Sequence, residues 1–420
     1  MIRAELLLSG FAEVATLGTG GVPRAGAAQR ELSLYSDASI AIDRGRIVAL
    51  GARRRVARTV QLRPNGRTVE SSGQVALPGF VDAHSHLLFA GTRHREIEAK
   101  LAGADYATIA RSGGGIYSTV RRTRAASASA IIAGSLARLR ALARSGVVAA
   151  EVKSGYALSH AGELDLLRLI PRLEERSGVR LVPTYLGAHA PPPGRSRPGY
   201  VRELTERTLP AVAAQRLARF CDVFCEPGFF SPAESERILR RAAQLGLGLK
   251  LHADEFADSG GAALAARLGA TSADHLLSTR ASGRRALARA GVTGVLLPVT
   301  PFASLSRLVP PGRELVDAGV PVALGSDCSP NSWVESMPVV LAHAVYRGRL
   351  TPAEAITAAT VNAAHASGLP PGTGTLSVGG AADLLVFSGH AAEEIPTRFG
   401  ALPEQIYRRG EAVFSTTVRE

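Results

Sequence analysis

The stretch GFVDAHSHLLFAGTR, residues 79–93, places two histidines one residue apart directly behind an apolar run. Because successive side chains of a strand point to opposite faces, an extended VDAHSH segment puts His84 and His86 on the same side. Two imidazoles on one face at the end of a buried strand can bind one metal ion together. In isolation an HxH pair more often represents two solvent-facing loop histidines, so the metal interpretation depends on the rest of the chain.

From residue 75 onward, short apolar or β-branched runs alternate with longer stretches that carry apolar residues at helical spacing. One such stretch begins SPAESE, where Ser231 fits a helix N-cap and Pro232 the first helical position. Eight strands alternating with helices predict a (β/α)8 TIM-type barrel, because eight is the number that closes it; an open doubly wound sheet is the alternative. The runs are VALPGFVDAHSH, GVVAAEVKS, VRLVPTYLGAHA, DVFCEPGFF, LGLKLHADE, ATSADHLL, VTGVLLPVT and VPVALGSD.

The two ends of the chain have a different pattern. ASIAIDRGRIVALG, residues 38–51, alternates by twos around a DRGR turn, which is typical of a β-hairpin. GTLSVGGAADLLVFSG, from Gly374, has the character of a partner strand. We therefore predict that both termini form one small β-sandwich domain. The expected parts are 1–74 and 369–420 for this domain and 75–368 for the barrel.

Composition narrows the class of protein. The chain has 420 residues, 46% of them hydrophobic, and no apolar run reaches the roughly 18 residues that a bilayer span requires. The start of the chain has too short an apolar region for a signal peptide. Three cysteines, Cys221, Cys225 and Cys328, make an odd and sparse set that argues against a disulfide framework. We expect a cytoplasmic enzyme with no membrane association.

The formal charge of +13 raises the alternative of a basic nucleic-acid-binding protein. The basic residues are almost all arginines, scattered through helical segments where they interrupt an apolar repeat. The sequence has no RNA-binding signature, no zinc-finger spacing and no long basic arm. We therefore expect no nucleic-acid partner.

Reactive side chains occur at the ends of most of the eight runs, where barrel enzymes carry their active sites. His84 and His86 on the first strand, His252 on the fifth and Asp327 on the eighth would converge at one end of the barrel. Taken singly, Asp327 fits a turn cap and His252 a core histidine. As a set they predict a site for one divalent ion, and imidazole with carboxylate suits Zn²⁺ or Fe²⁺.

Two further residues lie beside this expected metal site. Glu255, in HADE, is able to hold a water or exchange protons beside the ion, or else to complement a helix N-terminus. His275, in SADHL, is able to stabilise an oxyanion, or else is a buried structural histidine.

The arrangement of HxH on the first strand, His on the fifth and sixth, and Asp on the eighth resembles the amidohydrolase superfamily. More narrowly, HSHLLFAGTR, RSGGGIYSTVRRTRAAS, EVKSGYAL, GAHAPPP and LKLHADE resemble the imidazolonepropionase family, over nearly the whole chain. The resemblance implies hydrolysis of the cyclic amide of 4-imidazolone-5-propionate to N-formimidoyl-L-glutamate, in histidine degradation, by a metal-activated water. The alternatives are a formimidoylglutamate deiminase, a ring deaminase or a catalytically inactive scaffold.

The resemblance also implies roles for individual residues. Arg93 would bind the carboxylate of this small anionic ring substrate, since its planar fork suits a carboxylate, although by itself it fits an ordinary surface arginine. Tyr156 and His189 would hydrogen-bond the ring and its arm. Glu255, His275 and Asp327 are the expected catalytic residues. Either carboxylate is a candidate base, and the histidine is expected to stabilise the oxyanion. The expected substrate contacts are Arg93, Tyr156, His189, Glu255, Ser329, Asn331 and Ser332.

Three features refine this prediction. Family members commonly read D-x-N-P after the strand-eight aspartate, whereas this chain has Ser329 at the Asn position, which leaves room for an altered substrate. In some amidohydrolases a carbamylated lysine on strand four bridges two metal ions. Lys153 lies on strand two, so we expect a single metal ion, with Lys153 in a buried ion pair. Gly113–Gly115 predict a flexible loop that closes over the site. A homodimer is compatible with a barrel of this size.

Overall fold

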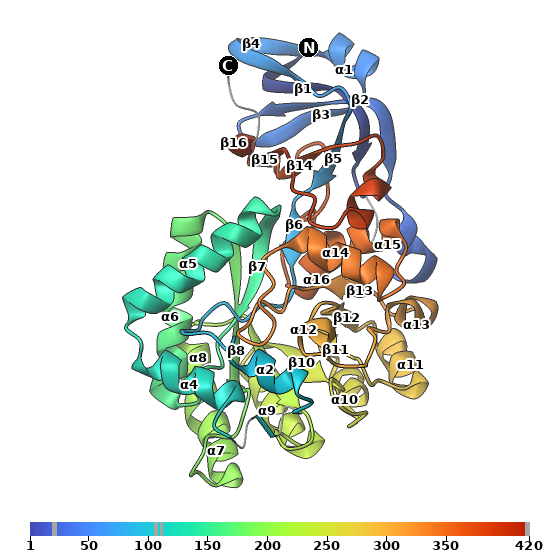
Figure 1. Cartoon of the computed structure of the whole chain (residues 1–420). Helices are drawn as coiled ribbons and strands as arrows, with labels where there is room; N and C mark the ends of the chain where they lie inside the picture. Colours follow the sequence, from blue (N-terminus) through green and yellow to red (C-terminus); the bar gives the residue numbers. More distant parts are fainter. Residues whose placement is uncertain (19–22, 105–107, 110–111, 416–420) are drawn as a thin grey trace.

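The computed structural model describes residues 1–18, 23–104, 108–109 and 112–415, and these contain two eight-stranded sheets (Figure 1). One sheet follows chain order, and each strand pairs in parallel with the next. The backbone N–H of Ala83 donates to the carbonyl of Leu324 at 3.2 Å, which joins the last strand to the first. The (β/α)8 barrel is thus confirmed. Its strands are β6 (Phe80–Asp82), β7 (Val147–Lys153), β8 (Arg180–Ala188), β9 (Phe220–Cys225), β10 (Gly248–Ala253), β11 (Ser272–His275), β12 (Thr293–Leu296) and β13 (Val322–Leu324).

The second sheet combines both ends of the chain in the order β16-β15-β14-β5-β1-β2-β3, and β4 pairs with β1. The expected hairpin around DRGR is present, since β2 and β3 pair antiparallel. The expected contact between the ends is also present, because β14 pairs antiparallel with β5. The separate terminal β domain is therefore confirmed. Its strands are β1 (Ile2–Ala15), β2 (Leu34–Asp43), β3 (Arg46–Ala52), β4 (Val60–Glu70), β5 (Gln74–Pro78), β14 (Leu384–Ser388), β15 (Gln405–Arg408) and β16 (Glu411–Ser415).

The expected domain limits stay a prediction. The run VALPGFVDAHSH, which we expected to form one barrel strand, is divided between the two sheets. Residues up to Pro78 pair with β14 and extend the terminal sheet, and the barrel begins with β6. Residues 416–420 of the expected C-terminal part lie outside the described residues.

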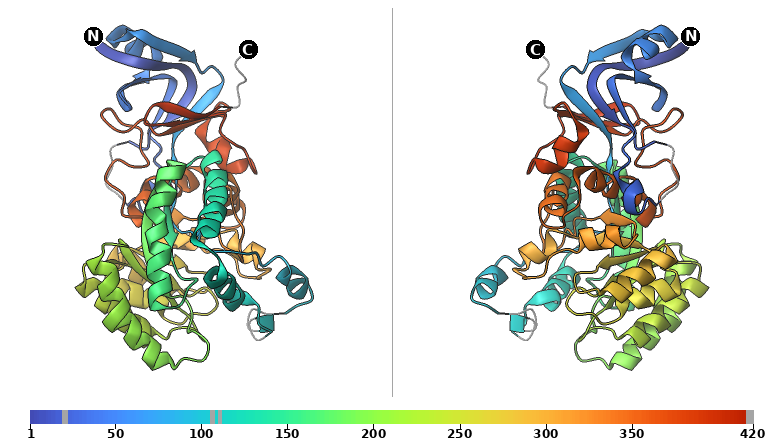
Figure 2. Two further views of the ribbon diagram at one scale, coloured as in Figure 1. Left: turned by 90° about the vertical axis from the view of Figure 1, so that its left-hand side faces the viewer. Right: turned by 90° about the vertical axis from the view of Figure 1, so that its right-hand side faces the viewer.

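Helices cover the outside of the barrel (Figure 2). The helix start expected at SPAESE is confirmed: Ser231 and Glu234 form a reciprocal capping box at the start of α9 (Pro232–Gln244). No helix among the described residues combines the length and apolarity needed to cross a bilayer. The helices are α1 (Arg53–Thr59), α2 (Glu96–Leu101), α4 (Gly115–Ala125), α5 (Ala128–Arg144), α6 (His160–Ser177), α7 (Arg197–Glu203), α8 (Leu209–Ala214), α9 (Pro232–Gln244), α10 (Gly261–Leu268), α11 (Ala281–Ala290), α12 (Thr300–Ala303), α13 (Gly312–Asp317), α14 (Met337–Tyr346), α15 (Pro352–Ala358) and α16 (Val361–Ala366), with 3₁₀ turns η1 (Gly26–Arg30) and η3 (Ala392–Thr397) and a π turn η2 (Leu204–Thr208).

The apolar core of the barrel domain has two main parts. The largest core lies between the strands and the surrounding helices. A smaller cluster, which includes Val81, Ala149, Val295 and Ala323, packs with alanines of α16. This smaller cluster joins β6, β7, β12 and β13 to α16. The polar side chains considered below follow the apolar residues, at the carboxyl ends of the strands.

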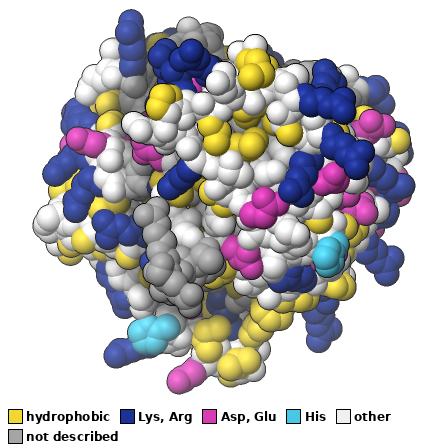
Figure 3. All heavy atoms as spheres, turned by 90° about the horizontal axis from the view of Figure 1, so that it is seen from above, with side chains coloured by type: hydrophobic (Ala, Val, Ile, Leu, Met, Phe, Trp, Pro, Cys, Tyr) yellow, Lys and Arg dark blue, Asp and Glu magenta, His cyan; other side chains and the backbone are white. Residues whose placement is uncertain are grey.

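The outer face that includes the terminal sheet carries many basic side chains (Figure 3). They are spread across this face among acidic, apolar and uncharged groups rather than gathered into one patch. The positive charge of the chain is therefore dispersed on this side.

Candidate active site and metal centre

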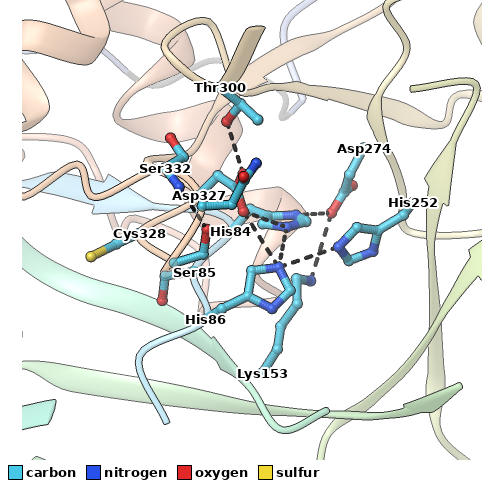
Figure 4. A network of polar contacts seen from close by, with 12 residues as sticks. His84, Ser85, His86, Lys153, His252, Asp274, Thr300, Asp327, Cys328 and Ser332 are labelled. Atoms are coloured by element: carbon cyan, nitrogen blue, oxygen red, sulfur yellow. Dashed lines mark hydrogen bonds and ion pairs between the residues drawn. The ribbon is translucent and has the colours of Figure 1, made fainter. Parts of the chain in front are cut away.

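Three histidines and one aspartate converge at the carboxyl ends of the barrel strands (Figure 4). The Nε2 atom of His86 lies 3.1 Å from Nε2 of His84 and 3.3 Å from Nε2 of His252. It lies 3.4 Å from Oδ1 of Asp327, and all four side chains are buried. Side chains that are up to 243 residues apart in sequence (327 − 84) thus point their ligand atoms at one another.

The protonation of this cluster suits a cation. Burial, together with the positive charge of Lys153 and the neighbouring imidazoles, holds the pKa of His84 well below its usual value. Burial and the neighbouring imidazoles do the same to the pKa of His86. Neutral imidazoles present lone pairs, and three Nε2 atoms facing one another beside a carboxylate match the donor set that divalent zinc prefers. The residues present therefore fit a metal ion.

Two aspartates orient the histidines from behind. His84 Nδ1 lies 2.6 Å from Oδ2 of Asp274, and His252 Nδ1 lies 2.9 Å from Oδ2 of Asp222. The contact of His84 is a hydrogen bond, and a carboxylate on Nδ1 keeps the proton there and leaves Nε2 open, as in most protein metal sites. The contact of His252 is as close but lacks hydrogen-bond geometry. Our reading of the sequence missed both aspartates. Asp222 had a usable signal, because a carboxylate inside the apolar run FCDVFC must find a buried partner.

Lys153 occupies the ion pair that we expected. Its Nζ lies 2.7 Å from Oε1 of Glu151 and 2.8 Å from Oδ2 of Asp222, all without solvent exposure. Burial disfavours the ammonium, but the attraction of the carboxylates outweighs it and raises the pKa of Lys153. The lysine therefore remains charged beneath the histidines.

The cluster opens into a small cavity of about 60 Å³. His86, His252 and Asp327 line it, and so do most residues expected to contact substrate. Ser332 is the exception: it is buried and donates its N–H to Ser329 Oγ at 3.2 Å, so it supports the cavity wall without belonging to it. The predicted residues in the wall are Arg93, Tyr156, His189, Glu255, His275, Ser329 and Asn331, with Ile116, Phe224 and Phe256 between them.

Two carboxyl groups in the cavity have elevated pKa values. Burial raises the pKa of Asp327 to about 6, although a hydrogen bond from Thr300 Oγ1 at 2.8 Å opposes the shift. Burial, then repulsion by Asp327 and Glu226, raises the pKa of Glu255 well above its usual value. Carboxyl groups of this kind are suited to accept a proton near neutral pH.

His275 lies next to the carboxyl group of Glu255 and next to the histidines of the cluster. Its Nδ1 is 3.7 Å from Oε1 of Glu255, and its ring is also close enough to His84 and His252 to share a metal with them. His275 and Asp327 have positive φ angles of 72° and 49°. Such backbone strain in non-glycine residues tends to cluster at functional sites.

Arg93 is oriented by an acidic neighbour. Its Nε donates to Oε2 of Glu96 at 2.8 Å, and the other oxygen of Glu96 accepts the N–H of Gly115 at 2.8 Å. Gly115 begins α4 with a φ of 62°. The glycine run is therefore connected to Arg93 through one carboxylate; its closing motion stays a prediction.

The positions of Tyr156 and His189 depend on a further buried carboxylate that the sequence analysis did not identify. Glu163, in α6, accepts the N–H groups of Gly155, Ala157 and Leu158 at 2.7, 2.8 and 2.7 Å. Gly155 in turn presents its carbonyl to His189 Nδ1 at 3.1 Å. One side chain thus fixes the loop that carries Tyr156 and orients His189.

Replacing Glu163 with alanine should lower the free energy of unfolding by about 3 kcal/mol, because it leaves three buried N–H groups without their acceptor. Chemical denaturation measures this loss. Glu174→Ala is the matched control on the same helix, because Glu174 is exposed and accepts a single N–H from Leu181. Equal losses for the two variants would contradict the role given to Glu163.

Comparison with known proteins gives a consistent result. Residues 115–414 match the amidohydrolase family. An imidazolonepropionase from Symbiobacterium thermophilum is 45% identical over 98% of both chains, and one from Geobacillus thermodenitrificans is 40% identical over 94% of both. A zinc-bound adenosine deaminase from Xanthomonas campestris superposes with a TM-score of 0.68 at 19% identity, over 99% of this chain and 94% of its own. A zinc complex of atrazine chlorohydrolase from Arthrobacter aurescens gives 0.68 at 18% identity, over 98% and 95%. At these identities the two structures support the barrel fold alone.

Proposed function

The chain belongs to the imidazolonepropionase family of the amidohydrolases, and from this premise we propose that it hydrolyses 4-imidazolone-5-propionate to N-formimidoyl-L-glutamate, a step of histidine degradation. It is a hydrolase of cyclic-amide C–N bonds. The observation that carries the proposed substrate is a single small cavity that joins the His/Asp cluster to Arg93. A neutral ring such as guanine has no carboxylate to meet this guanidinium.

The His/Asp cluster and the family support a metal cofactor. We infer one divalent ion per chain, Zn²⁺ or Fe²⁺, held by His84, His86, His252 and Asp327. When bound, such an ion lowers the pKa of a coordinated water toward neutrality and polarises a carbonyl oxygen.

The residues of the chain have separate tasks in this proposal. Arg93 binds the propionate carboxylate, and Tyr156 and His189 hydrogen-bond the ring and its arm. Ser329 and Asn331 contact the opposite side, and Ser332 acts through Ser329.

The remaining residues transfer protons and stabilise charge during the reaction. As water oxygen bonds to the ring carbonyl carbon, Glu255 or Asp327 accepts the proton that water loses. His275 stabilises the negative charge on the carbonyl oxygen. The ring C–N bond then breaks, the stored proton passes to the departing nitrogen, and the carbonyl becomes the second carboxylate of the product.

The test is direct turnover. The full-length protein, with its metal content measured, is given 4-imidazolone-5-propionate, and loss of ultraviolet absorbance is followed together with formation of N-formimidoyl-L-glutamate. We expect both to proceed at the same rate. Absence of turnover by metal-loaded protein, with deamination of a ring compound in its place, would overturn the proposed substrate.

Arg93→Gln should raise KM by about 10- to 100-fold with a smaller change in kcat, because it removes a charge-assisted contact to the substrate carboxylate. Steady-state kinetics separate the two constants. Arg95→Gln, two residues away and exposed, is the control and should stay within about twofold of the original KM. A KM for Arg93→Gln no higher than the control's would remove Arg93 from the site.

A cytoplasmic location and a homodimer stay part of the proposal. The three cysteines are free and buried, as expected for a chain without a disulfide framework.

A further inference from the structure

Lys153, at the end of β7, lies among three carboxylates beneath the histidine cluster. Figure 4 shows it beside one of them, Asp274. Besides its contacts with Glu151 and Asp222, its Nζ lies 3.7 Å from Oδ2 of Asp274. The side chain has no solvent exposure and does not line the substrate cavity. The proposed reaction gives it no task.

The same carboxylate oxygens face the metal-site histidines. Oδ2 of Asp222 lies 2.8 Å from Lys153 Nζ and 2.9 Å from His252 Nδ1. Oδ2 of Asp274 lies 3.7 Å from Lys153 Nζ and 2.6 Å from His84 Nδ1. One ammonium group is therefore next to both oxygens that hold the two imidazoles.

We propose that Lys153 is the positioning residue of the metal centre: its ammonium holds Asp222 and Asp274 so that His84 and His252 keep their protons on Nδ1 and turn Nε2 toward the ion. This inference rests on the proposed function, because it requires that the His/Asp cluster holds a metal.

The physical reason is charge. Two aspartates beneath a metal site repel each other, and a buried carboxylate without a counter-charge is costly. The ammonium offsets both and fixes the direction of each Oδ2. The other oxygens have partners of their own, since Asp222 Oδ1 accepts the N–H of His252 and Asp274 Oδ1 accepts the hydroxyl of Ser272. Loss of Lys153 should therefore disturb the Oδ2 atoms while the strands remain paired.

Glu151 provides a control within the same cluster. It contacts the ammonium as closely as Asp222 does and is equally buried, but its other contacts go to Ser85 rather than to a metal-site histidine. A purely structural role for the cluster would make Glu151 and Lys153 equivalent. A positioning role makes Lys153 alone matter for the metal.

The experiment measures the transfer of Zn²⁺ from the loaded full-length protein to a chromogenic chelator. Lys153→Met should weaken zinc binding by about 10- to 100-fold, the usual effect of losing an outer-shell partner, and Glu151→Gln by less than about threefold. Lys153→Met alone leaves three carboxylates without their counter-charge and is expected to reduce stability. The double variant Glu151→Gln/Lys153→Met keeps the net charge of the cluster and is therefore the variant to use if Lys153→Met does not fold. It should lose zinc as readily as Lys153→Met.

Cobalt substitution supplies a readout that a general loss of stability would not move. The visible absorption bands of bound Co²⁺ should shift in the Lys153 variants and stay unchanged in Glu151→Gln. A folded double variant with the zinc affinity and cobalt spectrum of the original protein would overturn the role of Lys153 and leave the proposed function intact. If the unaltered protein binds neither Zn²⁺ nor Co²⁺, the assignment of the metal site is wrong, and the role proposed for Lys153 is wrong with it.

Discussion

Asp327→Asn should lower kcat for 4-imidazolone-5-propionate by about 10³-fold, within the range attributed to a positioned acid or base. The change keeps the shape of the side chain but removes a negative charge next to His86, where Oδ1 lies 3.4 Å from Nε2. It also removes one of the two carboxyl groups with raised pKa that are available to accept the proton of water. Steady-state kinetics and metal analysis on the same sample separate loss of ion from loss of base.

Thr300→Val is the comparison for this variant. It keeps the carboxylate and removes only the hydrogen bond from Thr300 Oγ1 to Asp327 Oδ2, so a fall of about tenfold or less is expected. If Asp327→Asn kept more than a tenth of the original kcat, Asp327 would be neither an essential ligand nor the proton acceptor.

Removal of the metal should abolish turnover. A strong chelator is expected to reduce the rate to the uncatalysed level, because the remaining side chains alone do not supply a water of near-neutral pKa. Addition of Zn²⁺ or Fe²⁺ should restore activity, since imidazole ligands suit both ions. Assays of one sample before chelation, after it and after re-addition test this.

Mg²⁺ is the control for the metal experiment. It prefers oxygen ligands in octahedral geometry, so a site dominated by imidazole nitrogens should not recover with it. Turnover by protein from which the ion has demonstrably been removed would contradict the metal-dependent mechanism and leave the substrate assignment standing.

The barrel was predictable from eight apolar runs that alternate with helical stretches, and the His/Asp cluster was predictable because its residues follow those runs. A periodic pattern locates a strand, and the fold rule places its carboxyl end at the active site. His252 and Asp327 could therefore be assigned to one site although they are 75 residues apart in sequence (327 − 252).

The supporting contacts were not predictable in the same way. Asp222 and Asp274 act behind the histidines, and their pairing depends on the register of β10 with β9 and β11, which a sequence pattern does not supply. Glu163 lies at the start of a helix, where an acidic residue has an ordinary explanation. Only the folded loop shows that it accepts three N–H groups.

The remaining differences between the sequence-based predictions and the structure concern short segments that connect the elements. The tetrapeptide 75–78 has the apolar character of a barrel strand, yet it pairs with β14 because a core strand has the same sequence pattern in either sheet. Ser332 lies near the substrate contacts in sequence, but the tight turn from Ser329 directs it behind the cavity wall.

The central claim is that four side chains from different parts of the chain hold one divalent cation. Anomalous diffraction at the zinc absorption edge, from crystals of zinc-loaded protein, tests it most directly. We predict one peak per chain, within coordination distance of Nε2 of His84, His86 and His252 and of a carboxylate oxygen of Asp327. A peak elsewhere in the molecule, or these four groups dispersed around solvent with no peak between them, would contradict it.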